Sequence, residues 1–278
     1  MRVADNKNLK GKELFDYLKK NKAEIIKTKK SLAIKSEPFA VDAGLEFFEK
    51  KTVTKASGEN TDPNTLIAKV VGNTTMFCDS HLDVLGAGCY TKTIKENGVR
   101  GKNIIAHIHD HQHTIEAKLG IVKDIRTEQV SLKDLGVKGI GTVEALIFET
   151  EIRKDFNSKL FNLYKANEVN QHSIGLQYVK LELAVNDEGE EFKEEFALYK
   201  KHINQVINKE FVEERGYFWF VSEIKLFENS AVLFGANELT PTLEITKEIE
   251  PLDNTQENKN EPPEGTQAVK NWSYSKFI

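Results

Sequence analysis

The chain has 278 residues, of which 39% are hydrophobic and 29% charged, and its mean hydropathy is −0.46. This composition excludes collagen-like, membrane-spanning and wholly disordered proteins. At roughly 150 residues per domain, the length fits two domains at most, or one large domain with tails. The net charge of −4 arises from 39 basic and 43 acidic residues, too close to balance to favour nucleic acid as a partner. Only two cysteines are present and no signal peptide is apparent, so we expect a protein of the reducing cytoplasm.

The first 36 residues are strongly basic, with eleven Lys or Arg against four Asp or Glu. Four apolar residues in this stretch fit one helical stripe: Leu14, Leu18, Ile25 and Ile26. Such a helix could bind a polyanion or a partner helix, or its lysines could simply form a solvated face. The turn formers of residues 52–65 (TVTKASGENTDPNT) indicate a linker or loop. We therefore predict that residues 1–65 are a basic helical extension followed by a linker.

Residues 66–246 are dominated by strand-like segments rich in β-branched and apolar residues. These segments are 104–111, 118–127, 141–148, 172–185, 217–228 and 230–236. A helix is predicted over Phe156–Ala166, capped by Asp155 or Asn157. A second helix follows the turn at 186–189, and its apolar stripe is expected to be core: Phe192, Phe196, Tyr199, Ile203 and Val206.

The predicted fold class is α+β, with a mostly antiparallel β-barrel or sheet core and a few helices packed against it. Residues 247–278 combine few apolar groups with prolines, acids and amides. Because such a segment cannot repay the entropy of ordering, we predict a flexible C-terminal tail.

Four of the seven histidines fall within seven positions: His107, His109, His111 and His113. On a continuous strand all four would share one face. Imidazoles in that array could bind a transition metal, although the spacing matches no common zinc motif. Alternatively, one of them is a general base at a strand end.

Two further segments carry candidate chemistry. Ser173 and Gly175, in HSIGL at 172–176, lie at a predicted junction of helix and strand, where a serine could be an exposed nucleophile. Its neighbour His172 would point to the opposite face of a strand, so the base must come from elsewhere. Glu228 is a single carboxylate in an apolar stretch, either a surface residue of an edge strand or the group that orients an imidazole.

Taken in order, these motifs resemble the serine-type prohead proteases of tailed bacteriophages, which mature the capsid and are related in fold to the herpesvirus assemblin. The similar blocks are DVLGAGCYTKTIKEN at 83–97, His109-Asp110 followed by Leu119-Gly120, HSIGL at 172–176, and LFENSAVLFGAN at 226–237. The resemblance as a whole covers about 74–246, roughly 60% of the chain. Two positions depart from the family pattern, because His172 replaces a leucine and Gly235 a proline. Residues 186–215 form a longer connection than the family usually has, which indicates an insertion.

The resemblance implies a serine endopeptidase with a protease domain over 66–246 and a herpesvirus-protease-like fold. Ser173 would be the nucleophile, His109 the base, chosen because aspartate follows it, and Glu228 the group that orients the imidazole. The implied substrates are the major capsid protein and the scaffold protein inside an assembling procapsid in the host cytoplasm. The chain would also cleave itself, in the linker or the tail. A homodimer follows only by analogy, and no cofactor, membrane or nucleic acid is expected.

Two alternatives stay open at the level of sequence. One is a metal-binding hydrolase or binding module that uses the histidines at 107–113. The other is a non-enzymatic capsid-assembly protein, in which Ser173 is an ordinary strand residue and the basic helix a docking arm.

Overall fold

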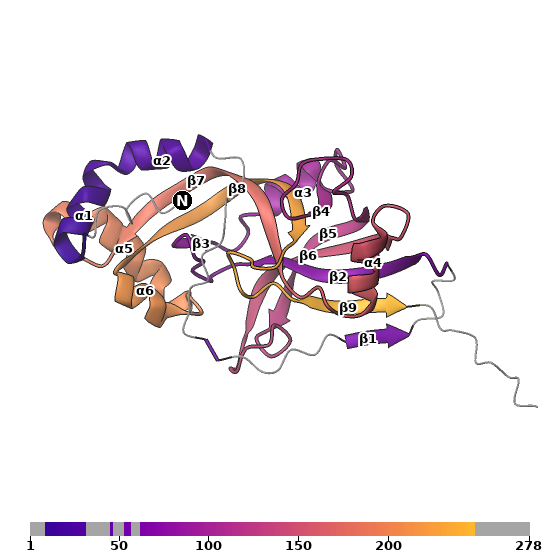
Figure 1. Ribbon diagram of the computed structural model, residues 1–278. Coiled ribbons are helices and arrows are strands. Elements are labelled where there is room, and N and C mark those ends of the chain that lie inside the picture. The colour runs from indigo at the N-terminus through magenta and orange to yellow at the C-terminus, as the bar shows by residue number, and fades with distance from the viewer. Residues whose placement is uncertain (1–8, 32–44, 47–52, 57–61, 248–278) are drawn as a thin grey trace, which may run out of the picture. The chain divides into compact units, whose positions relative to one another are not determined.

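The computed structural model describes residues 9–31, 45–46, 53–56 and 62–247, which fold into two β-sheets with helices packed on them (Figure 1). These residues belong to one unit that spans 1–248. The predicted α+β class is confirmed, because helices accompany sheets in which most strand pairs are antiparallel. In the described ranges the sheets do not close into a barrel.

The first sheet has five strands in the order β1-β9-β2-β6-β5. Their bounds are Val53–Ala56 (β1), Thr242–Lys247 (β9), Thr65–Thr74 (β2), Thr142–Arg153 (β6) and Gly120–Ser131 (β5). All neighbours are antiparallel except β1, which pairs in parallel with β9. β1 lies within the segment predicted as a linker or loop, so that prediction is wrong for Val53–Ala56. Its Val-Thr pair favours a strand once the edge of β9 is available.

The second sheet is built around β8, the longest strand, which spans Tyr217–Ala231. β7 (His172–Val185) pairs antiparallel with β8 along nearly its whole length. β3 (Asp83–Leu85) and β4 (Ala106–His109) pair with β8 in parallel at two different places. The predicted segment 230–236 is not a separate strand, because β8 continues to Ala231 and then ends.

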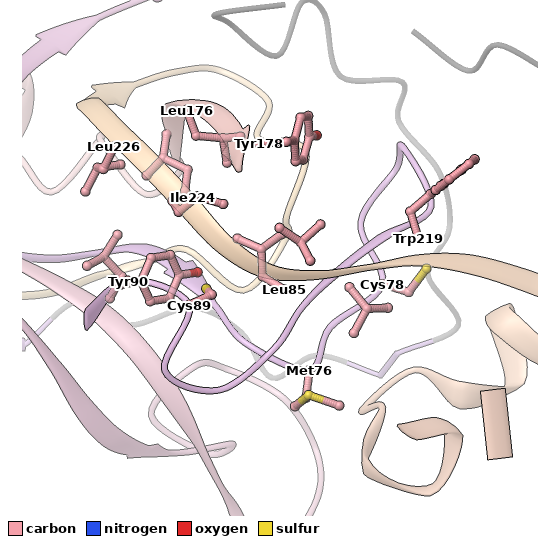
Figure 2. Close-up of a cluster of buried hydrophobic side chains, with 14 of the residues drawn as sticks. Met76, Cys78, Leu85, Cys89, Tyr90, Leu176, Tyr178, Trp219, Ile224 and Leu226 are labelled. Carbon is pink, nitrogen blue, oxygen red and sulfur yellow. The ribbon is translucent and has the colours of Figure 1, made fainter. Parts of the chain in front are cut away.

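The two sheets are in contact at Gly72, within a bulge of β2 between Val71 and Asn73. A Cβ at Gly72 would lie 3.3 Å from Ile174 of β7 and 3.2 Å from Phe148 of β6, so a glycine allows this close approach. Ile174 and Phe148 belong to the main buried cluster. Figure 2 shows other members of that cluster from β7 and β8, among them Leu176 and Ile224.

The predicted helix after residue 155 is confirmed as α4, Ser158–Lys165. Its N-cap is Asn157, one of the two predicted caps, whose side-chain oxygen accepts the N–H of Leu160 over 3.0 Å. A shorter helix, α3, spans Thr91–Asn97 and follows β3.

The predicted second helix lies in the connection from β7 to β8, and it is not one continuous helix. It consists of α5 (Lys193–His202), a 3-10 turn, and α6 (Lys209–Arg215). A 3-10 turn also precedes α5, at Glu190–Phe192. Four of the five predicted core residues of this region are buried: Phe192, Tyr199, Ile203 and Val206. The fifth, Phe196, is half-buried.

The basic N-terminal segment forms two helices, α1 (Gly11–Lys20) and α2 (Lys22–Ser31), with α2 beside β7 (Figure 1). Leu18 and Ile25 of the predicted stripe are buried. Glu195 of α5 accepts hydrogen bonds from Lys19 and Lys22, over 3.2 and 2.9 Å.

Another lysine of α2, Lys29, is itself buried and donates to Asp83 of β3 over 2.6 Å. A buried ion pair of this kind needs both members, because loss of one leaves an uncompensated charge. Part of the N-terminal positive charge is therefore used within the chain, against α5 and β3.

No helix in the described ranges is long and apolar enough to cross a lipid bilayer. The predicted flexible tail lies outside the described residues, except Lys247 at the end of β9. Of the predicted linker, residues 52 and 57–61 also lie outside them.

Candidate functional site

Strands β7 and β8 bring two of the predicted site residues onto one face of the second sheet. Ser173 pairs in register with Ser230, and Gly175 pairs with Glu228. Directly opposed residues of antiparallel strands share a face, as do residues two positions apart. The side chains of Ser173 and Glu228 therefore lie on the same face, one alternation apart.

His111 is the imidazole that reaches this face. β4 ends at His109, and the chain then turns through Asp110 and His111, whose φ angles are +50° and +53°. The N–H of Gln112 donates to the carbonyl of His109 over 3.0 Å and closes the turn. The turn carries His111 to Glu228, so that Nδ1 of the ring lies 2.7 Å from the carboxylate Oε1.

His109 is placed differently. It pairs in β4 with Ala231, which in turn pairs with His172 of β7. Strand alternation therefore places the His109 side chain on the face opposite to Ser173. Its Nδ1 lies 3.0 Å from Oδ2 of the adjacent Asp110, and in the described chain the ring makes no hydrogen bond to Glu228 or Ser173. The structure thus brings Glu228 together with His111 rather than with His109.

The Glu228 side chain is only 3% exposed, and both of its carboxylate oxygens are hydrogen-bonded. Oε1 is bonded to His111, and Oε2 accepts the hydroxyl of Ser230 over 2.8 Å. A buried carboxylate is unfavourable without such partners, so this pair accounts for its position. Because an ionised carboxylate only accepts, Nδ1 of His111 is the donor in this hydrogen bond. Nε2 has no hydrogen-bond partner among the described residues.

Ser173 is 8% exposed, and its hydroxyl has no hydrogen-bond partner in the described part of the chain. Its neighbour across the strands is Ser230, whose Oγ accepts the backbone N–H of His111 over 3.1 Å. Opposed residues have Cα atoms about 4.5–5.5 Å apart, so Ser173 lies one strand spacing from the residue that contacts His111. A hydroxyl, an imidazole and a carboxylate that holds the imidazole are the components of nucleophilic acyl transfer.

Comparisons with family models, curated proteins and solved structures found no match. The resemblance to the prohead proteases therefore stays a prediction that rests on the motifs of the sequence.

The four clustered histidines do not form the single array that a continuous strand would produce, because β4 ends after the second of them. His107 is fully buried, His111 contacts Glu228, and His113 is exposed. Among the residues that the structure describes, no three His, Cys, Asp or Glu side chains are grouped as metal ligands.

Gly175 has a role at this site that the motif alone did not suggest. A Cβ at Gly175 would overlap Oε1 of Glu228 and lie 2.9 Å from its Cγ and Cδ. The glycine of the Ser-x-Gly motif therefore leaves the space that the buried carboxylate occupies, rather than serving a backbone turn.

A buried polar network lies on the opposite face of β7 and β8, behind Ser173. Nδ1 of His172 donates to the carbonyl of Thr240 over 2.9 Å, and the Tyr164 hydroxyl donates to Nε2 of His172 over 3.0 Å. Nε2 of His107 accepts from the side-chain amide of Asn229 over 3.0 Å. Burial lowers the pKa of His172 to about 4 and that of His107 well below its usual range, so both rings are neutral at pH 7.

This network predicts a loss of stability in mild acid. An unfolded histidine has a pKa of about 6.5, so below that pH the unfolded chain binds protons that the folded chain does not. The free energy of unfolding should fall from about pH 6.5 downward, by about 1.4 kcal/mol per pH unit for each histidine. For His172 the fall continues to about pH 4.

Urea denaturation at several pH values between 7 and 4.5 measures this effect. In His172→Gln, the slope of the unfolding free energy against pH should correspond to about one proton fewer than in the unmodified protein. In the control His113→Gln, at an exposed position, this slope should match that of the unmodified protein. An equal slope in all three proteins would contradict the assignment of His172 as a neutral buried group.

Proposed function

We propose that this chain is a serine endopeptidase in which Ser173 is the nucleophile, His111 the general base and Glu228 the orienting carboxylate. The observation that carries the proposal is the hydrogen bond between His111 and Glu228 on the face that also presents Ser173. His111 takes the role that the His-Asp pair at 109–110 suggested for His109.

In the proposed mechanism, Oγ of Ser173 attacks the carbonyl carbon of the scissile peptide while Nε2 of His111 accepts the hydroxyl proton. Glu228 holds the proton on Nδ1 and stabilises the imidazolium that forms. The imidazolium then donates its proton to the leaving amine, the C–N bond breaks, and an acyl-enzyme remains. Water, deprotonated by the same imidazole, then attacks the ester carbonyl. The C–Oγ bond breaks, the imidazolium returns its proton to Oγ of Ser173, and the acyl group leaves as a carboxylic acid.

For the substrate, we propose the major capsid protein and the scaffold protein of a tailed bacteriophage, as the resemblance to the prohead proteases implies. Co-expression of this chain with those two proteins, followed by mass spectrometry of every chain, tests this directly. We expect shortened capsid and scaffold chains with the active protein. Full-length capsid and scaffold chains in assembled particles that contain this protein would contradict the proposal.

Gly175→Ala should reduce cleavage while the protein stays folded. The added methyl group would overlap the Glu228 side chain, so we expect the carboxylate to be displaced from His111 while the pairing of β7 with β8 is kept. Misplacement of a catalytic group by about 1 Å lowers rates on the order of 100-fold. Cleavage rates by mass spectrometry, with circular dichroism as the test of folding, measure the effect.

Gly139→Ala is the matched control, because a Cβ there would meet only Leu132, at 3.3 Å, in an exposed loop. A folded Gly175→Ala protein that cleaves at the original rate would contradict the role given to Glu228.

A further inference from the structure

We infer that Ser230 is a positioning residue, which fixes both the carboxylate of Glu228 and the turn that presents His111. The expected effect on the cleavage rate rests on the proposed function. The hydrogen bonds of Ser230 can be measured without any catalytic activity.

The Ser230 hydroxyl links the turn that follows β4 to the Glu228 side chain of β8. It accepts the backbone N–H of His111 over 3.1 Å and donates to Oε2 of Glu228 over 2.8 Å. Both directions are fixed by chemistry, since a backbone N–H only donates and an ionised carboxylate only accepts. The residue is fully buried, so water cannot readily replace either bond.

The turn needs such support because its backbone is unusual. Asp110 and His111 both have positive φ, a conformation that side chains with a Cβ disfavour. Two backbone N–H groups tie this turn to the end of β8: the N–H of Asp110 donates to the carbonyl of Ala231, and the N–H of His111 to the Ser230 hydroxyl. Only the second depends on a side chain, and only the second also reaches Glu228.

Three hydrogen bonds among His111, Ser230 and Glu228 form a closed ring. The ring runs from the His111 backbone to the Ser230 hydroxyl, on to Oε2 of Glu228, and from Oε1 back to the His111 imidazole. This ring fixes the imidazole at both its backbone and its Nδ1. The remaining nitrogen, Nε2, takes no part in this ring and has no hydrogen-bond partner among the described residues.

Ser230 differs from Ser173 because its hydroxyl is already used in two hydrogen bonds. Its proton is bonded to Glu228 and its side chain is inaccessible, whereas the hydroxyl of Ser173 has no hydrogen-bond partner in the described chain. The geometry therefore gives the two paired serines different tasks.

The test compares Ser230→Ala with Ser230→Thr, which keeps a hydroxyl, and with Ser222→Ala, an exposed serine of the same strand. We expect Ser230→Ala to lower kcat about 100-fold with little change in KM, because binding is intact and orientation is lost. Ser230→Thr should restore most of the rate, and Ser222→Ala should match the unmodified protein.

A second measurement does not depend on catalysis. In NMR spectra of the unmodified protein, the Nδ1 proton of His111 should be slow to exchange, as should its backbone N–H. Ser230→Ala should lose both slow exchanges while the thermal unfolding midpoint confirms that the protein remains folded. Slow exchange retained in Ser230→Ala would overturn the inference, whatever the activity.

The kinetic and the NMR measurements together distinguish failure of the proposed function from failure of the positioning role. If the exchange results are as expected but no variant has endopeptidase activity, the proposed function is wrong and the positioning role stands. If Ser230→Ala does not fold, the backbone N–H of His111 in the unmodified protein decides, and exchange as fast as in a free peptide overturns the inference.

Discussion

Ser173→Ala should abolish cleavage, with a rate loss on the order of a millionfold, because the covalent intermediate cannot form without the hydroxyl. The loss should not reflect unfolding, since the Ser173 hydroxyl has no hydrogen-bond partner in the described chain whose loss would leave a group unsatisfied. Single-turnover cleavage followed by mass spectrometry, together with the urea midpoint, measures rate and stability on the same sample.

Ser222→Ala is again the matched control for this prediction, because it removes a serine hydroxyl from an exposed position of β8. It should cleave at the original rate. If Ser173→Ala retains more than about a hundredth of the activity, a millionfold loss is excluded and the nucleophile lies elsewhere.

His111→Ala should lower the rate by a similar factor, on the order of a millionfold, since the base and its orienting carboxylate act as one unit with the nucleophile. His109→Ala should remain within a few-fold of the original rate. The two imidazoles are two residues apart, but strand alternation and the turn at Asp110 place them differently, and only His111 is bonded to Glu228.

The paired comparison decides between the two histidines. Loss of activity in His109→Ala with retention in His111→Ala would restore the base suggested by the His-Asp pair. It would also reduce the His111–Glu228 bond to a structural contact.

Several elements could be predicted because local signals determine them. The helix α4 has its apolar spacing and an asparagine at the N-cap, and β7 has a long run of β-branched and apolar residues. In both cases the local preference agrees with the packing, so the prediction and the structure coincide.

The identity of the paired imidazole could not be predicted in the same way. Its place depends on where β4 ends and on a turn with positive φ at Asp110 and His111, where no glycine marks such a turn. A pattern of alternate histidines reads as a continuous strand, and only tertiary contacts with β8 reveal that the strand has ended.

Two further features depend on strand register, which is hard to predict here because the pairing of β7 with β8 shifts at three places. The space that Gly175 leaves for Glu228, and the pairing of Ser173 with Ser230, follow from which residues of β7 and β8 are opposed. One signal was nevertheless available, since Glu228 and Ser230 are two positions apart and alternation places them on one face.

Reaction with a fluorophosphonate tests the central claim most directly, because this reagent modifies serines that a neighbouring base activates and needs no known substrate. Peptide mapping by mass spectrometry should locate the adduct on Ser173 in the unmodified protein, and the adduct should be absent from His111→Ala. An adduct on Ser230 or another serine, no adduct at all, or equal labelling of Ser173 without His111, would contradict the account.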